Sequence, residues 1–295
     1  MKAANIILTS RCNQNCPFCF YSEVEAKEIS FLHVVNLLNQ LRLEGFQSII
    51  LTGGEPSVSK NLHRVLEEIF WNEFNVVSIH TNGSIIQSKN VMQVIAKFKE
   101  RVHLTISLHG SSASLHDSLV NSVGSFERAS NLLFWATQNN VKTSINFAIM
   151  KYNIKDILAT LDFTEKFKVY AINLLLVHDC TENLKFKAPI SDVVKELLKI
   201  LRFSPNSFRT DGIPYCLLRG YEQIVGEAYW PKHLSVISLK AKKYDYYKSL
   251  IYELRYWPKS CKFCMMREIC MGVYREYKSD FELIYPGPII DNAIE

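Results

Sequence analysis

The segment RCNQNCPFCF, from Arg11 to Phe20, places three cysteines within eight residues, directly after the apolar run NIILT at residues 5–9. A strand that is buried on both faces of a parallel sheet reads as such a run of Ile, Leu and Val. In folds built from parallel strands, the functional groups gather where the strands end. The segment therefore predicts an α/β fold whose site begins at the end of the first strand.

Five further apolar runs of strand length follow, and helical patterns lie between them. The predicted strands are 5–9, 48–52, 76–81, 102–107, 143–150 and 171–177. The predicted helices are 31–44, 62–71, 91–98, 126–138, 157–167 and 193–201, where apolar residues recur at helical spacing. Six β-then-α units in succession imply a parallel sheet with right-handed crossovers. We predict a partial (β/α)6 TIM-like barrel over residues 1–205, because two units are missing from a full eight-fold barrel.

The composition is that of a globular protein with one large domain, or with one domain and a small appendage. The chain has 295 residues, of which 48% are hydrophobic and 21% charged, and its formal net charge is +5. So small a positive surplus does not predict a nucleic-acid-binding face. No apolar stretch approaches the ~20 residues of a membrane span, and the first apolar run is too short for a signal peptide. We therefore expect a cytoplasmic protein.

The clustering of the cysteines predicts metal or redox chemistry, because disulfides are rare in the cytoplasm. The eight cysteines are Cys12, Cys16, Cys19, Cys180, Cys216, Cys261, Cys264 and Cys270. Four thiolates close a zinc site or fill an iron–sulfur cube. Three thiolates leave one iron of a [4Fe–4S] cube without a protein ligand, and that iron can bind a small molecule. The alternative is that the first three cysteines are part of a zinc site.

Polar or ligating residues follow every predicted strand and are expected to converge on one mouth of the barrel. After the three cysteines they are Gly53-Gly54-Glu55-Pro56, His80-Thr81-Asn82-Gly83, Ser107-Leu108-His109-Gly110, Asn146 and His178-Asp179-Cys180. Taken singly, each has a structural alternative, since Gly-Gly and Asn-Gly pairs form ordinary turns and Ser or Asn side chains form structural hydrogen bonds.

The spacing C-x3-C-x2-C resembles the signature of the radical S-adenosylmethionine (SAM) superfamily, and the neighbouring motifs extend the resemblance over residues 4–203. Phe18 matches the aromatic residue that the family places beside adenine. Residues 53–56 match its GGEP motif, whose small residues would let the backbone approach the SAM amino group. Ser107 and Asn146 match positions that contact the methionine carboxylate and the ribose. Asn82 lies at the same mouth and is expected on the SAM side.

The resemblance implies that Cys12, Cys16 and Cys19 hold a [4Fe–4S] cluster whose open iron chelates SAM. The reduced cluster, served by an electron donor such as flavodoxin or ferredoxin, would cleave SAM to methionine and a 5′-deoxyadenosyl radical. That radical would abstract a hydrogen atom from the substrate. The protein would position the substrate and exclude water and other quenchers.

A second cysteine set follows the point where the β-then-α pattern stops, after Asp211. Cys216 comes first, and CKFCMMREICMG then supplies Cys261, Cys264 and Cys270. This arrangement resembles the twitch domain, a shortened SPASM domain, and implies a small C-terminal extension over residues 206–295 with one auxiliary [4Fe–4S] cluster. Its implied role is electron transfer, substrate binding or structure. A zinc site with four cysteine ligands is the alternative, because the C-x2-C spacing also suits zinc.

Two features of the remaining sequence have more than one interpretation. Residues 240–259, KAKKYDYYKSLIYELRYWPK, mix basic and aromatic side chains as single-strand binders do. Their helical spacing favours a packed amphipathic helix instead, and no nucleic-acid partner is expected. Cys180 is either a buried thiol or a hydrogen-atom donor at the mouth, and it is our candidate catalytic residue. His178 and Asp179 are substrate contacts or part of a solvated loop.

The resemblance leads to a radical SAM oxidoreductase that modifies a peptide by crosslinking, oxidation or epimerisation, as in the maturation of ribosomally made peptides. A radical SAM dehydrogenase or rearrangement enzyme acting on a small metabolite is the alternative. The molybdopterin cyclase of the superfamily is disfavoured, because its second cluster has three cysteines and its chain ends in Gly-Gly. A non-catalytic iron–sulfur or zinc protein is a third hypothesis, which SAM cleavage would exclude.

Overall fold

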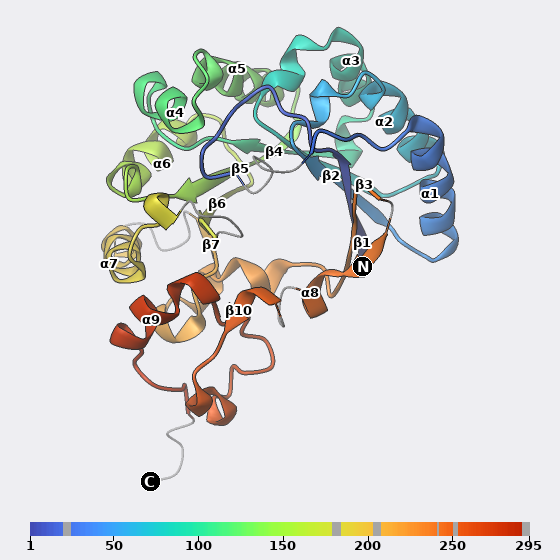
Figure 1. Ribbon diagram of the computed structural model, residues 1–295. Helices are drawn as coiled ribbons and strands as arrows, with labels where there is room; N and C mark the ends of the chain where they lie inside the picture. The colour runs from blue at the N-terminus through green and yellow to red at the C-terminus, as the bar shows by residue number, and fades with distance from the viewer. Residues whose placement is uncertain (20–24, 179–183, 203–207, 241, 250–252, 291–295) are drawn as a thin grey trace.

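A curved, mostly parallel sheet forms the main body of the protein (Figure 1). The structure is a computed structural model, and it describes residues 1–19, 25–178, 184–202, 208–240, 242–249 and 253–290. The order of the nine strands in the sheet is β7-β6-β5-β4-β3-β2-β1-β8-β9, and a second sheet pairs β10 with β11. This α/β architecture confirms the predicted partial barrel.

Six of the seven strands that form the wall of the barrel agree closely with the prediction, and the last, β7, was not predicted. They are β1 (Lys2–Thr9), β2 (Ser48–Gly53), β3 (Val76–Thr81), β4 (Val102–Ser107), β5 (Lys142–Ile149), β6 (Ala171–Leu176) and β7 (Arg209–Asp211). Adjacent strands among them are paired in parallel, so all their carboxyl ends lie at one edge of the sheet. Crossovers of this kind need helices, which explains the alternating pattern.

The helices lie on the outer, convex side of the sheet (Figure 1). They are α1 (Phe31–Leu43), α2 (Leu62–Trp71), α3 (Lys89–Lys97), α4 (Ala113–Val120), α5 (Ser125–Gln138), α6 (Ile157–Glu165) and α7 (Ile190–Leu201). All of them except α4, which packs on α5, bury an apolar face against the strands, as α2 does with Leu62, Val65, Leu66, Ile69 and Phe70. The sheet and these helix faces form one continuous hydrophobic core. Of the seven helices, α4 was not predicted.

The C-terminal part of the chain joins the barrel sheet instead of standing apart from it. β8 (His233–Ile237) pairs in parallel with β1, on the side opposite to β2, and β9 (Lys243–Asp245) pairs antiparallel with β8. β7 extends the other edge of the sheet by pairing with β6. The division of the chain at residues 205 and 206 remains a prediction, and the sheet contains strands from both sides of it.

The predicted amphipathic helix over residues 240–259 is confirmed only in part. The helical residues described there are α8 (Tyr246–Ser249) and residues 253–254, and Arg255–Tyr256 form β10, which pairs with β11 (Val273–Tyr274). Tyr247 donates a hydrogen bond to the Pro231 carbonyl. The prediction is therefore wrong at both ends of the segment, where the chain forms β9 and β10. α9 (Lys278–Ile284) follows β11.

None of the helices among the described residues is both long and apolar enough to cross a membrane.

Candidate active site

A cavity of about 360 Å³ lies at the carboxyl ends of the barrel strands, and we call it the strand-end cavity. The predicted site residues that line it are Cys12, Cys16, Phe18, Cys19, Gly53, Gly54, Asn82, Ser107 and Asn146. They come from the cysteine loop after β1 and from four further strands or their ends, β2, β3, β4 and β5. The structure therefore brings together nearly every residue that the strand-end rule selected for cofactor binding.

The three thiols of the cysteine loop lie close to one another. The Cys19 amide donates to the Cys16 carbonyl at 3.0 Å, and the Gln14 amide donates to Cys12 Sγ at 3.4 Å. Burial, together with the nearby Cys19 and Cys12 thiols, raises the pKa of Cys16 well above its usual range. Because a ligating cysteine is a thiolate, positive iron at this position would offset the mutual repulsion.

Gly53 and Gly54 hold the cysteine loop against the end of β2. The Gly54 amide donates to the Thr9 carbonyl at 2.7 Å, and the Glu55 amide donates to the Arg11 carbonyl at 2.8 Å. A Cβ atom on Gly54 would lie 2.1 Å from the Arg11 carbonyl oxygen, and one on Gly53 would lie 2.1 Å from that of Thr9. Gly53 also has a φ of +128°. Glycine is therefore required at both positions, because β1 and the cysteine loop approach too closely to leave room for a Cβ atom.

The side chain of Glu55 serves the frame of the site instead of lining the cavity. It is buried, and its carboxylate accepts hydrogen bonds from Thr81 Oγ1 at 2.9 Å, the Asn82 amide at 2.7 Å and the Ser57 amide at 3.0 Å. Burial raises the pKa of this carboxyl. Glu55 was predicted among the cofactor-binding residues. The structure makes it a positioning residue that ties the GGEP turn to the end of β3.

Two histidines behind the cysteine loop were not selected from the sequence. The ring of Phe18 meets His109 edge-on, with 5.3 Å between centroids. His109 Nδ1 accepts from the Ala148 amide at 3.1 Å, and burial lowers the pKa of His109 to about 3. The ring is therefore neutral. The sequence signal that could have selected His109 is its position after the fourth strand, beside Ser107.

A chain of hydrogen bonds fixes these groups behind the cavity. The His109 amide donates to His116 Nδ1 at 3.0 Å, and His116 Nε2 lies 3.2 Å from Ser125 Oγ. Gln14 Nε2 donates to the same hydroxyl. Asn82 Nδ2 donates to Asn13 Oδ1 at 2.8 Å. The cysteine loop is thus anchored to β3, β4 and α5 through polar side chains that no cysteine spacing reveals.

A second cavity of about 360 Å³ lies inside the barrel next to the first, and we call it the lumen cavity. Its polar lining comes from His80, Thr105, Asn146, Asn173, Arg209 and Asp211. His80, Asn146, Leu175 and Asp211 line both cavities. The strand-end cavity therefore continues into the barrel, where Trp230 and Tyr246 of the C-terminal part form one wall.

Cys216, Cys261, Cys264 and Cys270 line one further cavity, which we call the four-cysteine cavity. Burial, with the nearby Cys270, Cys261 and Cys264, raises the pKa of Cys216 to about 12. Trp257 Nε1 donates to the Cys270 carbonyl at 3.2 Å, and the Gly272 amide donates to Cys270 Sγ at 3.4 Å. The four thiols thus line one cavity, although 45 positions separate Cys216 from Cys261.

Thiolates are the ligands of iron–sulfur clusters, and each thiolate of a four-iron cube binds a different iron. In the described ranges, no group of three or more His, Cys, Asp or Glu side chains is arranged to hold one metal ion. The donor chemistry of both cysteine sets therefore fits an iron–sulfur cube.

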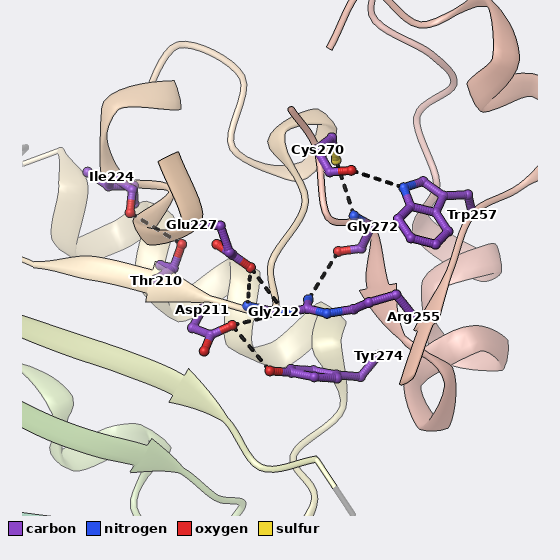
Figure 2. A network of polar contacts seen from close by, with 10 residues as sticks. All are labelled: Thr210, Asp211, Gly212, Ile224, Glu227, Arg255, Trp257, Cys270, Gly272 and Tyr274. Carbon is purple, nitrogen blue, oxygen red and sulfur yellow. Dashed lines mark hydrogen bonds and ion pairs between the residues drawn. The ribbon is translucent and has the colours of Figure 1, made fainter. Parts of the chain in front are cut away.

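A buried ionic network joins the four-cysteine cavity to the barrel (Figure 2). Arg255 is fully buried, and its Nη2 lies 3.1 Å from Asp211 Oδ1 and 3.4 Å from Glu227 Oε1. Its Nη1 donates to the Gly272 carbonyl at 3.4 Å. Burial, and repulsion by Asp211, raise the pKa of Glu227 to about 8. Asp211 lines the strand-end cavity, so this network connects the two candidate sites.

The remaining predicted residues are placed only in part. His178 lines the strand-end cavity, and its ring stacks on Tyr274 with 4.3 Å between centroids. Cys180 and Asp179 lie outside the described residues. The role of Cys180 therefore stays a prediction.

Residues 6–164 match the family model of the radical SAM superfamily, and the chain belongs to that family. Its members bind a [4Fe–4S] cluster and SAM, which accounts for the cysteine loop and the residues around the strand-end cavity. The twitch resemblance of the C-terminal part is not covered by this match. The match thus establishes the superfamily, and the assignment of the C-terminal part as a twitch domain remains a proposal.

Similar proteins differ in what they do. A probable GTP 3′,8-cyclase from Metallosphaera sedula is 23% identical over 203 residues, which are 66% of this chain and 62% of the relative. The antilisterial bacteriocin subtilosin biosynthesis protein AlbA of Bacillus subtilis is 25% identical over 156 residues, 52% of this chain and 34% of AlbA. The chain thus matches between one third and two thirds of the length of these two proteins.

Solved structures support the fold over the whole described chain. Streptococcus suis SuiB, crystallised with S-adenosylmethionine, superposes with a TM-score of 0.72 at 18% identity, covering 98% of this chain and 76% of SuiB. At this identity the likeness shows a shared fold. It extends beyond the residues that the family model matches, and so includes the C-terminal part.

Proposed function

We propose that this protein is a radical SAM enzyme that abstracts a hydrogen atom from a peptide, with a second iron–sulfur cluster in its C-terminal part. The observation that carries the proposal is the strand-end cavity, which three cysteines of the family signature share with six of the seven other predicted SAM-side contacts. Membership of the superfamily supplies the chemistry, since a reduced cluster cleaves bound SAM to a 5′-deoxyadenosyl radical.

The chain's own residues have separable roles in this proposal. Cys12, Cys16 and Cys19 hold the cluster. Phe18, braced by the neutral ring of His109, stacks beside the adenine. Asn82, Ser107 and Asn146 offer hydrogen bonds to the methionine and ribose parts of SAM from three neighbouring strands. Gly53 and Gly54 keep the loop in place.

The four-cysteine cavity supports an auxiliary [4Fe–4S] cluster of the twitch type. Four thiolates leave no open iron for a ligand, which favours electron transfer or a structural role. The Arg255 network leads from Cys270 toward the strand-end cavity. An auxiliary cluster there would take one electron from a substrate radical, and the net reaction would be an oxidation.

Reconstitution under anaerobic conditions tests both cluster assignments. The wild type is expected to bind about eight irons, because two cubes contain four each, and to release 5′-deoxyadenosine from SAM with dithionite. Replacing Cys12, Cys16 and Cys19 by Ala should remove about four irons and all SAM cleavage. Replacing Cys216, Cys261, Cys264 and Cys270 by Ala should remove the other four. A zinc atom in place of those irons would overturn the auxiliary-cluster proposal.

The preference for a peptide is supported by AlbA, a bacteriocin biosynthesis protein by name. The cyclase supports the alternative, a small-metabolite substrate. An extract of deuterium-grown cells, separated into peptide and small-metabolite fractions, distinguishes the two. Transfer of deuterium into 5′-deoxyadenosine from the peptide fraction is the expected result. Transfer from the metabolite fraction alone would overturn it, and a mock-treated extract without enzyme is the control.

The proposed role of Cys180 as a hydrogen-atom donor has its own test. Cys180→Ala is expected to reduce the yield of hydrogen-returned product relative to the 5′-deoxyadenosine formed. An unchanged ratio of the two would remove Cys180 from the mechanism. The electron donor, a flavodoxin or ferredoxin, is part of the same proposal and is tested by replacing dithionite with each reduced protein.

A further inference from the structure

The short strand β7 presents two opposite charges to the lumen cavity. Arg209, Thr210 and Asp211 all line this cavity, and the hydroxyl of the buried Thr210 donates to the Ile224 carbonyl at 3.4 Å. Because side chains alternate along a strand, Arg209 and Asp211 point to the same face, at a spacing of about 6.6 Å. The two charges come from a segment with no apolar run.

One oxygen of Asp211 remains available to a ligand. Oδ1 accepts hydrogen bonds from Arg255 Nη2 at 3.1 Å and from the Tyr274 hydroxyl at 3.2 Å. No donor among the described residues contacts Oδ2, which carries no dashed line in Figure 2. Arg255 and Tyr274 thus fix the orientation of the carboxylate. Asp211 lines both the lumen and the strand-end cavities.

Arg209 offers a cation at the other end of the lumen cavity. Its guanidinium lies 4.1 Å from the ring centroid of Tyr229 and 5.4 Å from that of Tyr170. It forms no ion pair with any carboxylate in the described part of the chain. Arg209 and Tyr229 also line an outer groove beside α6, so this end of the lumen lies toward the surface.

The rest of the lumen cavity is polar but uncharged. Among the described residues that line it, only Arg209 and Asp211 carry charge, because burial lowers the pKa of His80 to about 4. His80 forms no hydrogen bond within the described ranges and faces both cavities. Asn173 Nδ2 donates to Asn146 Oδ1 at 2.9 Å, which leaves the Asn146 amide hydrogens for a ligand.

We propose that the lumen cavity binds a zwitterionic amino-acid group of the substrate, with its ammonium on Asp211 Oδ2 and its carboxylate on Arg209. The inference rests on the proposed function and narrows its substrate to a free amino acid or a dipeptide, since both charged ends must enter one cavity. A cavity of about 360 Å³ is at the small end of ligand pockets, so it accepts one or two residues. Because Asp211 also lines the strand-end cavity, the ammonium end lies toward the radical.

Binding of a dipeptide probe to the anaerobically reconstituted full chain tests this site. Ala-Ala is compared with N-acetyl-Ala-Ala and with Ala-Ala amide by titration calorimetry in the presence of SAM. Each blocked end removes one charge-assisted contact, and we expect each to weaken binding about tenfold or more.

Two variants assign the ends of the probe. Arg209→Gln should remove the difference in affinity between Ala-Ala and Ala-Ala amide. It should keep the loss of affinity that N-acetylation causes. Asp211→Asn should show the reverse pattern. A general loss of structure weakens all three probes together and cannot produce this crossed pattern. Asp162→Asn, in the outer groove, is the control and should leave both discriminations in place.

Equal affinity for the three probes, or none for Ala-Ala, would overturn the inference. If Asp211→Asn does not fold, the wild-type probe series and Arg209→Gln still decide it. SAM cleavage measured on the same samples separates this inference from the proposed function. Cleavage without discrimination among the probes defeats the zwitterion site alone, and discrimination without any cleavage defeats the proposed function and leaves the site.

Discussion

The guanidinium of Arg255 contacts Asp211 through a 3.1 Å bond between Nη2 and Oδ1, although 44 positions separate the two residues. Arg255 belongs to β10 in the C-terminal part, and Asp211 ends β7 in the barrel sheet. Asp211 lines both the strand-end and the lumen cavity. One buried cation therefore links the frame of the barrel to the four-cysteine cavity.

Arg255→Leu is expected to lower the free energy of unfolding by about 3–5 kcal/mol, because it leaves the carboxylates of Asp211 and Glu227 without their buried partner. Chemical denaturation of the anaerobic, reconstituted protein measures the change. Lys155→Leu is the control, since Lys155 forms its ion pair with Glu196 on the surface, and it should change stability little. Similar losses for both variants would contradict the assigned role of Arg255.

Glu227→Gln is expected to flatten the dependence of stability on pH. The pKa of Glu227 is raised from 4.5 to about 8 in the folded protein. Between these values the folded state binds more protons than the unfolded state, so wild-type stability falls as the pH rises through this window. Unfolding temperatures from pH 5.5 to 8.5 measure the slope. The idea fails if the variant and the wild type show the same slope.

Gly54→Ala is expected to reduce the iron bound by the cysteine loop, because its Cβ would lie 2.1 Å from the Arg11 carbonyl oxygen. The φ of Gly54 is not in the left-handed region, so the effect isolates this contact. Iron content after reconstitution, together with circular dichroism of the fold, is the measurement. Gly45→Ala is the control away from the site, since its φ of +78° costs stability while its Cβ meets nothing within 4 Å, so its iron loading should be unchanged. Full iron loading in Gly54→Ala would refute the role.

Glu55→Gln is expected to cost about 1–3 kcal/mol of stability, since its amide group turns one accepting oxygen into a donor that faces another donor. The carboxylate accepts from Thr81, Asn82 and Ser57 in a buried position. Thermal unfolding and the KM for SAM are measured together, with exposed Glu67→Gln as the control. A changed KM at unchanged stability would instead indicate direct contact with SAM.

Much of the barrel could be predicted because its strands are buried on both faces. Val76–Thr81 and Val102–Ser107 are strands over the predicted bounds, and α2 occupies its predicted range. β7, Arg209–Asp211, has three residues and no apolar run, and it exists through its pairing with β6. β8 was likewise missed, because its partner β1 is more than 220 positions away. Such pairings depend on contacts between distant segments and leave no local pattern in the sequence.

The site was predictable where chemistry demands a fixed residue type and spacing, as in Cys12, Cys16 and Cys19. The site was less predictable where the close packing of the backbone sets the residue type. The glycines of the GGEP turn line the strand-end cavity, and their expected contact with SAM stays a prediction. The sequence did not indicate that they also accommodate the carbonyl groups of Thr9 and Arg11. The tether from Gln14 through Ser125 connects positions 111 residues apart, so no spacing in the sequence indicates it.

The pairing of β8 with β1 has a consequence for synthesis on the ribosome. Until residues 233–237 have emerged, one edge of β1, the first strand made, lacks its partner along Lys2–Ile6. An open edge of this kind is a template for pairing with another chain, and chains of this size fold while other parts are still being made. Premature termination before His233 would therefore leave an aggregation-prone product, and chaperone binding to nascent chains should persist until that point.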